Sequence, residues 1–266
     1  MSLTRAELKN VKFLLSKKGR RDAGQYSAEG IRLLEEAVRS KTWPEKVYYA
    51  TTSLTERGQA LVTEFKRRGV TVAGVSASDL ERMTDAATPQ GILAVFPYPS
   101  TDLTELYGGD SRNILVCENI ADPGNVGTLC RSALAFGYDL VVLCGSCAEP
   151  YAPKVVRSSV GALFGLPVAV APIDDLLALV EREQIALAVA DIGGRSNFRH
   201  VCEQIKKRRL ALVLCSEGAG PSDQVSRKAD YLIRVRHEQK VESLNVAIAG
   251  SILMKERYDA MSRRQK

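Results

Sequence analysis

The sequence has few of the residues from which many enzymes build their sites. It holds two histidines and one tryptophan in 266 residues, and aromatic residues make up 6% of it. It contains no Ser-His-Asp set, no metal-ligand cluster and no P-loop. No apolar run is long enough to span a bilayer, and the N-terminal residues lack the apolar core of a secretory signal. We therefore expect a cytoplasmic protein without a metal and without a membrane segment.

The six cysteines do not favour a redox or zinc site. Cys117, Cys144 and Cys215 fall in strand patterns and Cys130 falls in a helix pattern, which is typical of small apolar core residues. Cys144 and Cys147 form a C-x-x-C pair, but no second pair accompanies it. We interpret the cysteines as packing residues.

The charge of the chain favours an anionic partner. The formal net charge is +6 and the isoelectric point is about 9.0, so the protein attracts polyanions, nucleic acid first. An apolar fraction of 45% indicates a globular core. A connector rich in proline, glycine and serine lies between residues 96 and 110. This connector predicts two domains, residues 1–105 and 106–266.

Hydrophobic periodicity predicts that both domains are α/β. In the first domain we expect a basic turn at 16–24, helices at 4–15, 31–39, 54–68 and near 79, and strands at 46–50, 70–75 and 91–96. In the second we expect strands at 113–117, 139–144, 168–171, 185–190, 210–215 and 231–235. The expected helices of the second domain are 125–136, 153–164, 174–183, 200–207, 222–228 and 244–260. Strands that alternate with helices predict a parallel sheet with helices on both faces.

Three of these strands run directly into polar loops. Because the carboxyl ends of parallel strands share one edge of the sheet, where such folds bind ligands, we expect the loops to form one site. The candidate residues of this site are Asn125, Arg131, Glu217, Ser243 and Asn245.

Each candidate has a structural and a functional interpretation. Asn125 either caps a helix or faces a ligand. Arg131 either extends along an apolar stripe to solvent or binds a phosphate or carboxylate. Glu217 braces its loop or pairs with a charge, and Ser243 is the expected N-cap of the last helix. Asn245 then falls in the first turn, where its low helix propensity suggests a side chain kept for hydrogen bonding.

Two neighbouring features refine the picture of these loops. Gly218 and Gly220 allow a ligand to approach the backbone closely. The small residues after Asn245, in the run VAIAGSILMKE, predict that another element packs very close to the last helix.

At this point the motifs resemble a known family. PGNVGTLCRSALAFG, LCSEGAGPSD and ESLNVAIAGSILMKE resemble, in order and spacing, the three motifs of the SpoU/TrmH branch of the SPOUT RNA methyltransferases. Residues 151–168 resemble a segment of the branch that modifies ribosomal RNA. The stretch SKKGRRDAGQYSAEGIRLLEEAV is similar to the small RNA-binding domain of that branch, which itself resembles certain ribosomal proteins.

The resemblance implies a fold, a reaction and partners. It implies a SPOUT-type parallel sheet with a trefoil knot, preceded by a small α/β RNA-binding domain. The implied enzyme is a homodimer with its active site near the dimer interface. It transfers a methyl group from S-adenosylmethionine to a ribose 2′-hydroxyl, in 23S-type ribosomal RNA. A transfer RNA methyltransferase and a non-catalytic SPOUT-fold RNA-binding factor are the alternatives. A nucleotide-binding oxidoreductase is disfavoured because the three-glycine fingerprint is missing.

The resemblance also assigns residues. It implies catalytic roles for Asn125, Arg131, Glu217, Ser243 and Asn245. It places the cofactor against Ser216, Glu217, Gly218, Gly220, Ile233, Ser243, Leu244 and Asn245. With RNA as the implied partner, the candidate phosphate contacts of the first domain are Lys17, Lys18, Arg20, Arg21 and Arg32.

Overall fold

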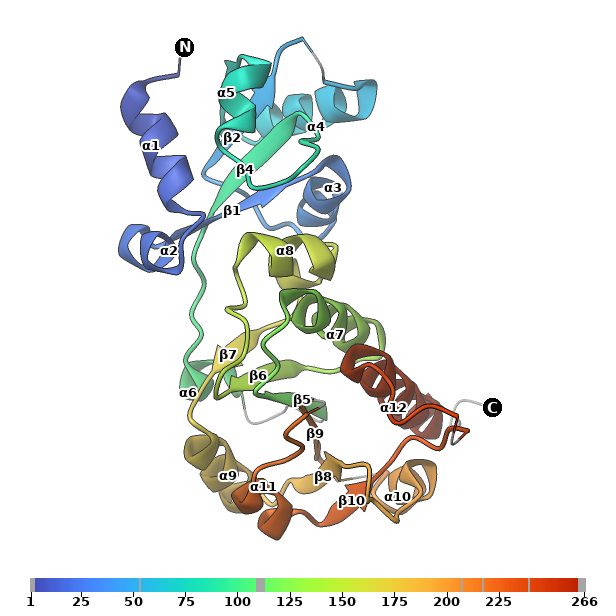
Figure 1. Cartoon of the computed structure of the whole chain (residues 1–266). Coiled ribbons are helices and arrows are strands. Elements are labelled where there is room, and N and C mark those ends of the chain that lie inside the picture. The colour runs from blue at the N-terminus through green and yellow to red at the C-terminus, as the bar shows by residue number, and fades with distance from the viewer. Residues whose placement is uncertain are drawn as a thin grey trace. The chain divides into compact units, whose positions relative to one another are not determined.

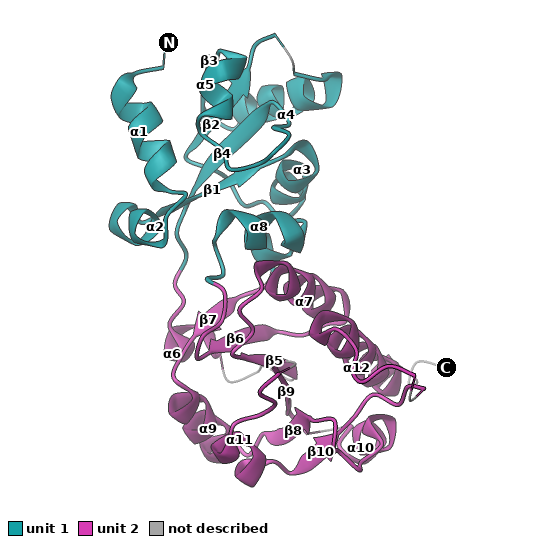
Figure 2. Ribbon diagram, in the orientation of Figure 1, with its two compact units in different colours: residues 1–99, 149–165 teal, residues 100–148, 166–266 magenta. Residues whose placement is uncertain are grey.

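The computed structural model describes residues 3–52, 54–108, 113–206, 208–216, 218–238 and 240–262. The chain forms two compact units (Figure 1, Figure 2). Unit 1 consists of residues 1–99 and 149–165, and unit 2 of residues 100–148 and 166–266. The division at 99 lies six residues before the boundary expected at 105. Residues 149–165, which we expected in the second domain, pack with unit 1.

Unit 1 is built on a four-stranded sheet among its described residues. The strands β1 and β2 each pair antiparallel with β4, and β2 pairs parallel with β3. These strands are β1 (Gln25–Glu29), β2 (Lys46–Ala50), β3 (Thr71–Val75) and β4 (Ile92–Pro97). The helices are α1 (Arg5–Phe13), α2 (Lys17–Ala23), α3 (Ile31–Arg39), α4 (Glu56–Arg67) and α5 (Ala77–Glu81).

Two elements of unit 1 differ from the sequence expectation. Strand β1 was not predicted, and the expected basic turn at 16–24 is the helix α2. The side chain of Ser16 accepts a hydrogen bond from the amide of Gly19 at 2.9 Å, which caps the start of this helix. Gly24 ends the helix with a left-handed φ of 61°, a conformation that glycine adopts without strain. The flanking Ser and Gly therefore make a short helix from a run of charged residues.

The segment 149–165 completes unit 1. It contains α8 (Pro153–Ser159), which packs against β1, and a short 3₁₀ turn, Ala162–Phe164. The helix expected over 153–164 ends early because Val160 and Gly161 both have positive φ values, 49° and 91°. Glu149 anchors the segment: one of its oxygens, Oε2, accepts hydrogen bonds from Nε and Nη2 of Arg20 at 3.0 and 2.5 Å. Its Oε1 accepts a hydrogen bond from the Tyr98 hydroxyl at 2.5 Å.

Unit 2 holds a six-stranded sheet, in the order β10-β8-β9-β5-β6-β7, among its described residues. Every pair of neighbouring strands is parallel, as the alternation of strands and helices predicted. The strands are β5 (Asn113–Glu118), β6 (Leu140–Cys144), β7 (Val168–Val170), β8 (Ala186–Ala190), β9 (Leu210–Cys215) and β10 (Tyr231–Ile233).

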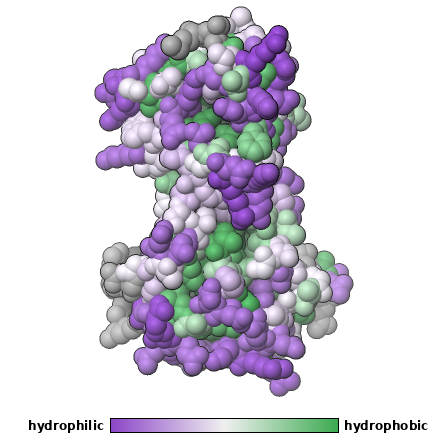
Figure 3. Space-filling view, turned by 90° about the vertical axis from the view of Figure 1, so that its left-hand side faces the viewer, coloured by the Kyte–Doolittle hydropathy of each residue, from purple (hydrophilic) through white to green (hydrophobic). Residues whose placement is uncertain are grey.

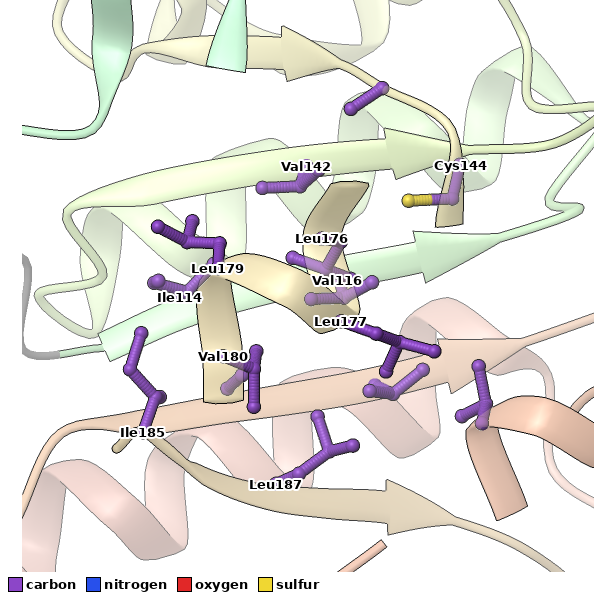
Figure 4. Packing of buried hydrophobic residues seen from close by; sticks show 14 of the residues in the cluster. Ile114, Val116, Val142, Cys144, Leu176, Leu177, Leu179, Val180, Ile185 and Leu187 are labelled. Atoms are coloured by element: carbon purple, nitrogen blue, oxygen red, sulfur yellow. The ribbon is translucent and has the colours of Figure 1, made fainter. Parts of the chain in front are cut away.

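Helices cover both faces of this sheet, as buried parallel sheets require. They are α6 (Leu103–Leu106), α7 (Pro123–Ala135), α9 (Ile173–Arg182), α10 (Phe198–Gln204), α11 (Asp223–Lys228) and α12 (Val246–Ser262). On one face, Leu176 and Val180 of α9 pack with Ile114, Val142 and Leu187 of the strands (Figure 4). The expected trefoil knot stays a prediction. No helix within the described ranges is long and apolar enough to cross a membrane.

The cysteines lie in the core, as their patterns predicted. All of them are buried except Cys147, which is partly buried. The thiol of Cys147 donates hydrogen bonds to the carbonyl oxygens of Cys117 and Cys144, at 3.2 and 3.3 Å, so it fastens the turn after β6. Burial raises the pKa of the Cys130, Cys144 and Cys202 thiols to about 12.

These raised pKa values predict slow thiol chemistry. The thiolate is the reactive form, and a thiol with a pKa of about 12 is ionised to only about one part in ten thousand at pH 8. We expect Cys130, Cys144 and Cys202 of the native protein to react with iodoacetamide far more slowly than free cysteine does. Mass spectrometry of peptides after labelling, in native buffer and in denaturant, measures the rates. Native rates equal to those in denaturant would contradict the burial.

Candidate functional site

The three loops expected to form the site follow strands at the carboxyl edge of the unit 2 sheet. Residues 119–122 follow β5, residues 216–222 follow β9, and residues 234–245 follow β10. Strands β5 and β9 are direct neighbours, with Glu118 in register with Cys215. Strand β8 separates β9 from β10. Parallel direction therefore places all three loops at one edge, as the sequence predicted.

A buried carboxylate that sequence reasoning missed joins the first two loops. Glu118, the last residue of β5, is 3% exposed. Its Oε2 accepts hydrogen bonds from the Ser222 amide at 3.1 Å and from the Cys215 thiol at 3.4 Å. Its carbonyl oxygen accepts one from the Ser216 amide at 3.2 Å. Glu118 thus holds loop amides, the role that we had expected of Glu217. An acidic residue directly after the apolar run 114–117 was the available signal.

Asn125 and Asn245 join the first loop to the third. The amide Nδ2 of Asn245 donates a hydrogen bond to Oδ1 of Asn125 at 3.1 Å, although 120 residues separate the two along the chain. Asn125 is the third residue of α7, and its own backbone amide bonds to the capping carboxylate of Asp122 at 2.8 Å. The structure therefore brings together two of the five candidate residues by direct contact.

Asn245, and not Ser243, caps the last helix. The Oδ1 of Asn245 accepts hydrogen bonds from the amides of Ala247 and Ile248 at 3.0 and 3.3 Å, which are first-turn donors of α12. The expected start of this helix at residue 244 was wrong, because α12 begins at Val246. The apparent propensity cost of Asn245 disappears at a cap, where asparagine is among the preferred residues. Ser243 lies partly buried in the loop.

Arg131 lies exposed on α7, on the same helix as Asn125. Six residues of helix separate them, roughly 9 Å along the axis. Helix α7 packs beside α12 (Figure 1), and the hydroxyls of Ser132 and Ser251 bond across this contact at 2.7 Å. Gly250 confirms the expected close packing of the last helix, since a Cβ there would lie 2.4 Å from Leu214. The helix that carries Arg131 and Asn125 is thereby held against the helix that Asn245 caps.

The other residues that were expected to contact the cofactor lie in the loops and strand ends along this edge. Ile233 is buried at the end of β10, and Leu244 is partly buried before α12. Ser216 accepts a hydrogen bond from the Gly220 amide through its carbonyl oxygen at 3.2 Å, which closes a turn. An added Cβ would meet no atom within 4 Å at Gly218 or Gly220. Glu217 lies outside the described residues.

A fourth loop, residues 191–196 after β8, belongs to the same edge and was not predicted. Its residues are fastened to β10: the Asp191 amide donates to the Ile233 carbonyl at 2.9 Å, and the Ser196 amide donates to the Leu232 carbonyl at 3.1 Å. Gly194 makes this approach possible, because a Cβ there would lie 2.6 Å from the carbonyl of Ile233. The pair of glycines after an apolar strand was the sequence signal for this close contact.

Comparisons with known proteins identify the family to which the chain belongs. A family model described as the SpoU rRNA Methylase family matches residues 112–255, more than half of the chain. This chain is a member of the SpoU rRNA methylase family. A second model, described as the MRM3-like substrate binding domain, matches residues 5–94, within unit 1.

Similar proteins extend over nearly the whole length. RlmP of Bacillus subtilis, a 23S rRNA (guanosine(2553)-2'-O)-methyltransferase, is 27% identical over 248 residues, 93% of this chain and 94% of that protein. The SpoU methyltransferase AviRb from Streptomyces viridochromogenes, solved in complex with the cofactor AdoMet, matches with a TM-score of 0.83 at 25% identity, covering 96% and 98%. An RNA 2'-O ribose methyltransferase of solved structure shares the fold, with a TM-score of 0.83 at 23% identity, covering 98% and 99%.

The basic residues expected to bind RNA in unit 1 are not equivalent. Lys17, Lys18, Arg21 and Arg32 are exposed. Arg20 is 2% exposed. It forms an ion pair with Glu149 and donates a hydrogen bond to the carbonyl oxygen of Leu14 at 2.8 Å. Its guanidinium is thus buried inside unit 1 and already paired with a carboxylate. The expectation that Arg20 contacts an RNA phosphate is therefore not met in this structure.

Two other kinds of site, a metal-binding cluster and a cavity, were compared with the carboxyl edge of unit 2. Within the described ranges, no three His, Cys, Asp or Glu side chains are grouped so that they could hold a metal. A cavity of about 250 Å³ lies elsewhere on unit 2, lined by residues that include Leu103, Val170, Pro172 and Leu179. Figure 3 shows apolar surface of unit 2 on the side where α6 and α9 lie. None of the candidate residues lines this cavity.

The cap at Asn245 predicts a measurable stability difference. Asn245→Ala removes the acceptor of two α12 amides, and we expect a loss of about 1 kcal/mol in the free energy of unfolding. Asn245→Ser restores a capping oxygen and recovers most of that loss. Urea denaturation measures both variants, with Ser243→Ala as the control that leaves stability unchanged. A larger loss from Ser243→Ala than from Asn245→Ala would mean that the cap is misassigned.

Proposed function

We propose that this SpoU family member transfers a methyl group from S-adenosylmethionine to a ribose 2′-hydroxyl of ribosomal RNA. The observation that carries the proposal is the Asn125–Asn245 hydrogen bond of 3.1 Å, which unites the first and third family motifs at the carboxyl edge. Glu118, at the end of β5, accepts a hydrogen bond from the Ser222 amide and so holds the second motif loop at the same edge. The matched family model and the 23S rRNA methyltransferase RlmP support the reaction and the class of RNA.

The loops fit S-adenosylmethionine. Gly218 and Gly220 leave open space beside the backbone, which suits a ligand held by main-chain groups. The buried hydroxyl of Ser222 lacks a hydrogen-bond partner among the described residues, so a polar group is available beside this loop. We assign cofactor binding to the loops that contain Ser216, Leu244 and Asn245. When bound, the cofactor supplies a methyl group on a sulfonium, which a hydroxyl oxygen can attack.

Arg131 positions the RNA in this mechanism. The attacking ribose hydroxyl is a weak nucleophile and must lose its proton. We assign the charge of Arg131 to an RNA phosphate, one of whose oxygens can accept that proton. Arg131 is exposed on the same helix as Asn125 and forms no ion pair with any described residue, so its charge is available to an RNA phosphate. Holding that phosphate aligns the hydroxyl with the methyl group, and alignment can contribute roughly 7–11 kcal/mol to catalysis.

The proposal predicts that Arg131→Ala abolishes methylation. We expect at least a hundredfold loss of methyl transfer to ribosomal RNA from radiolabelled S-adenosylmethionine, because the hydroxyl is no longer aligned. Calorimetric affinity for the cofactor should stay at the wild-type value. Arg182→Ala, which removes an exposed arginine paired with Glu183, is the control and should retain activity. Wild-type turnover by Arg131→Ala would refute the positioning role.

The same assay separates the alternatives. Incorporation into transfer RNA instead of ribosomal RNA would establish the transfer RNA enzyme. No incorporation into any RNA, with RNA still bound, would establish the non-catalytic binding factor. A cytoplasmic location stays a prediction from the sequence.

We also propose that two copies of the chain associate through α7 and α12. An exposed apolar face lies on these adjacent helices: Leu134 is 42% exposed, Ile248 is 55%, Ile252 is 37% and Tyr258 is 45%. The rings of Phe136 and Tyr258 lie 6.1 Å apart, which links the two helices within this face. Exposed large apolar side chains gathered on neighbouring elements mark protein interaction sites. Since Arg131 lies on the same helix as Leu134, association would place the candidate site beside the interface.

Association through this face predicts a mass of about twice 29.0 kDa in solution. Ile252→Lys places a charge in the apolar face, and we expect it to shift the protein to the monomer. Val170→Lys, at an exposed apolar position on β7, is the control and should leave the mass unchanged. Light scattering after size exclusion measures both. A monomeric wild-type protein would contradict the proposal.

A further inference from the structure

The arginines of unit 2 fall into two groups. Arg182, Arg199, Arg209 and Arg227 each form an ion pair with a carboxylate, at 3.2, 3.8, 3.1 and 4.0 Å respectively. Arg257 is buried and donates to the carbonyl oxygens of residues 205 and 208 and to a side-chain oxygen at 113. Four of these arginines are thus paired with a neighbouring acid, whereas the exposed Arg131, Arg195, Arg208, Arg234 and Arg236 form no ion pair with any described residue.

Three of the arginines without an ion pair lie in the carboxyl-edge loops, while Arg208 lies before β9 at the opposite edge. Arg195, Arg234 and Arg236 are exposed and form no ion pair with any described residue. Two acids share the third loop with them, Glu238 and Glu242, and both are exposed and form no ion pair with these arginines within the described ranges. Arg131 is likewise exposed and forms no ion pair with any described residue.

Backbone pairing holds the segments that carry Arg195 and Arg234 together. Ser196 and Ile233 form a parallel β-bridge, so Arg195, just before Ser196, and Arg234, just after Ile233, lie diagonally across it. The close approach at Gly194 fixes this arrangement, because the loop lies against the backbone of β10. Arg236 follows two residues later in the same loop. The three guanidiniums thus start from adjoining backbone at the edge that carries Asn245.

Unpaired, exposed guanidiniums at such a place suit a polyanion. Each presents a planar fork of donors that matches phosphate oxygens, and none is engaged by a carboxylate. We propose that Arg195, Arg234 and Arg236 bind phosphodiester groups of the RNA substrate and set its register at the site. This inference rests on the proposed function, and it assigns to unit 2 a share of RNA binding beyond the basic residues of unit 1.

The experiment compares two triple variants with the same change in net charge. Arg195→Gln/Arg234→Gln/Arg236→Gln removes the proposed contacts. Arg182→Gln/Arg199→Gln/Arg227→Gln removes three arginines of the same unit that carboxylates already neutralise. Fluorescence anisotropy with a labelled 20-nucleotide RNA of mixed sequence gives Kd at several salt concentrations. Because each phosphate contact contributes about 0.7 to the slope of log affinity against log salt, we expect the first variant to lower the slope by about 2. The second should leave it at the wild-type value.

Two further measurements make each outcome decisive. Equal slopes for the two variants overturn the inference. An unchanged slope together with weaker calorimetric binding of S-adenosylmethionine overturns it as well, because the arginines would then serve the cofactor carboxylate. If the triple variant does not fold, Arg195→Gln and Arg236→Gln are measured singly, and each should lower the slope by about 0.7. A wild-type protein that binds RNA without methylating it would refute the proposed function and leave the inference about RNA contacts standing.

Discussion

The direction of the strands in unit 2 is the constraint on which the site depends. Because every neighbouring pair is parallel, each strand ends at the same edge, and loops from distant parts of the chain meet there. Hydrogen bonds then make the meeting specific. Glu118 holds the loop after β9, and Asn245 reaches Asn125 across 120 residues of sequence. Asn245 also caps α12, so the bond that organises the site and the bond that starts the helix share one side chain.

The sequence was most informative in the strands of unit 2, where runs of apolar residues mark the buried segments. The strands of unit 2 are apolar over most of their length because both faces of a parallel sheet are covered, and each expected strand overlaps an observed one. The glycine-rich and asparagine-bearing loops were recognisable for the same reason, since they interrupt those runs. The family motifs then supplied what the local pattern lacks, the identity of the cofactor and the role that we propose for Arg131.

The expectations failed where a distant contact decides the local structure. Nothing near Arg20 in the sequence indicates Glu149, so a buried ion pair was mistaken for a surface charge. The segment 149–165 joins unit 1 through contacts that no local periodicity encodes, and β1 is a strand because β4 pairs with it. At α12 the error was smaller: Ser243 and Asn245 are both good capping residues, and only the packing of the helix selects between them.

The return of the chain to unit 1 at Glu149 has a consequence for the order of events during synthesis. The ribosome finishes residues 1–99 well before it makes Glu149, and in that interval Arg20 has no carboxylate partner inside the unit. An uncompensated charge in a core costs several kcal/mol. Unit 1 of the nascent chain therefore stays incomplete until Glu149 has been made, by which time the first two strands of the unit 2 sheet, β5 and β6, have also been made.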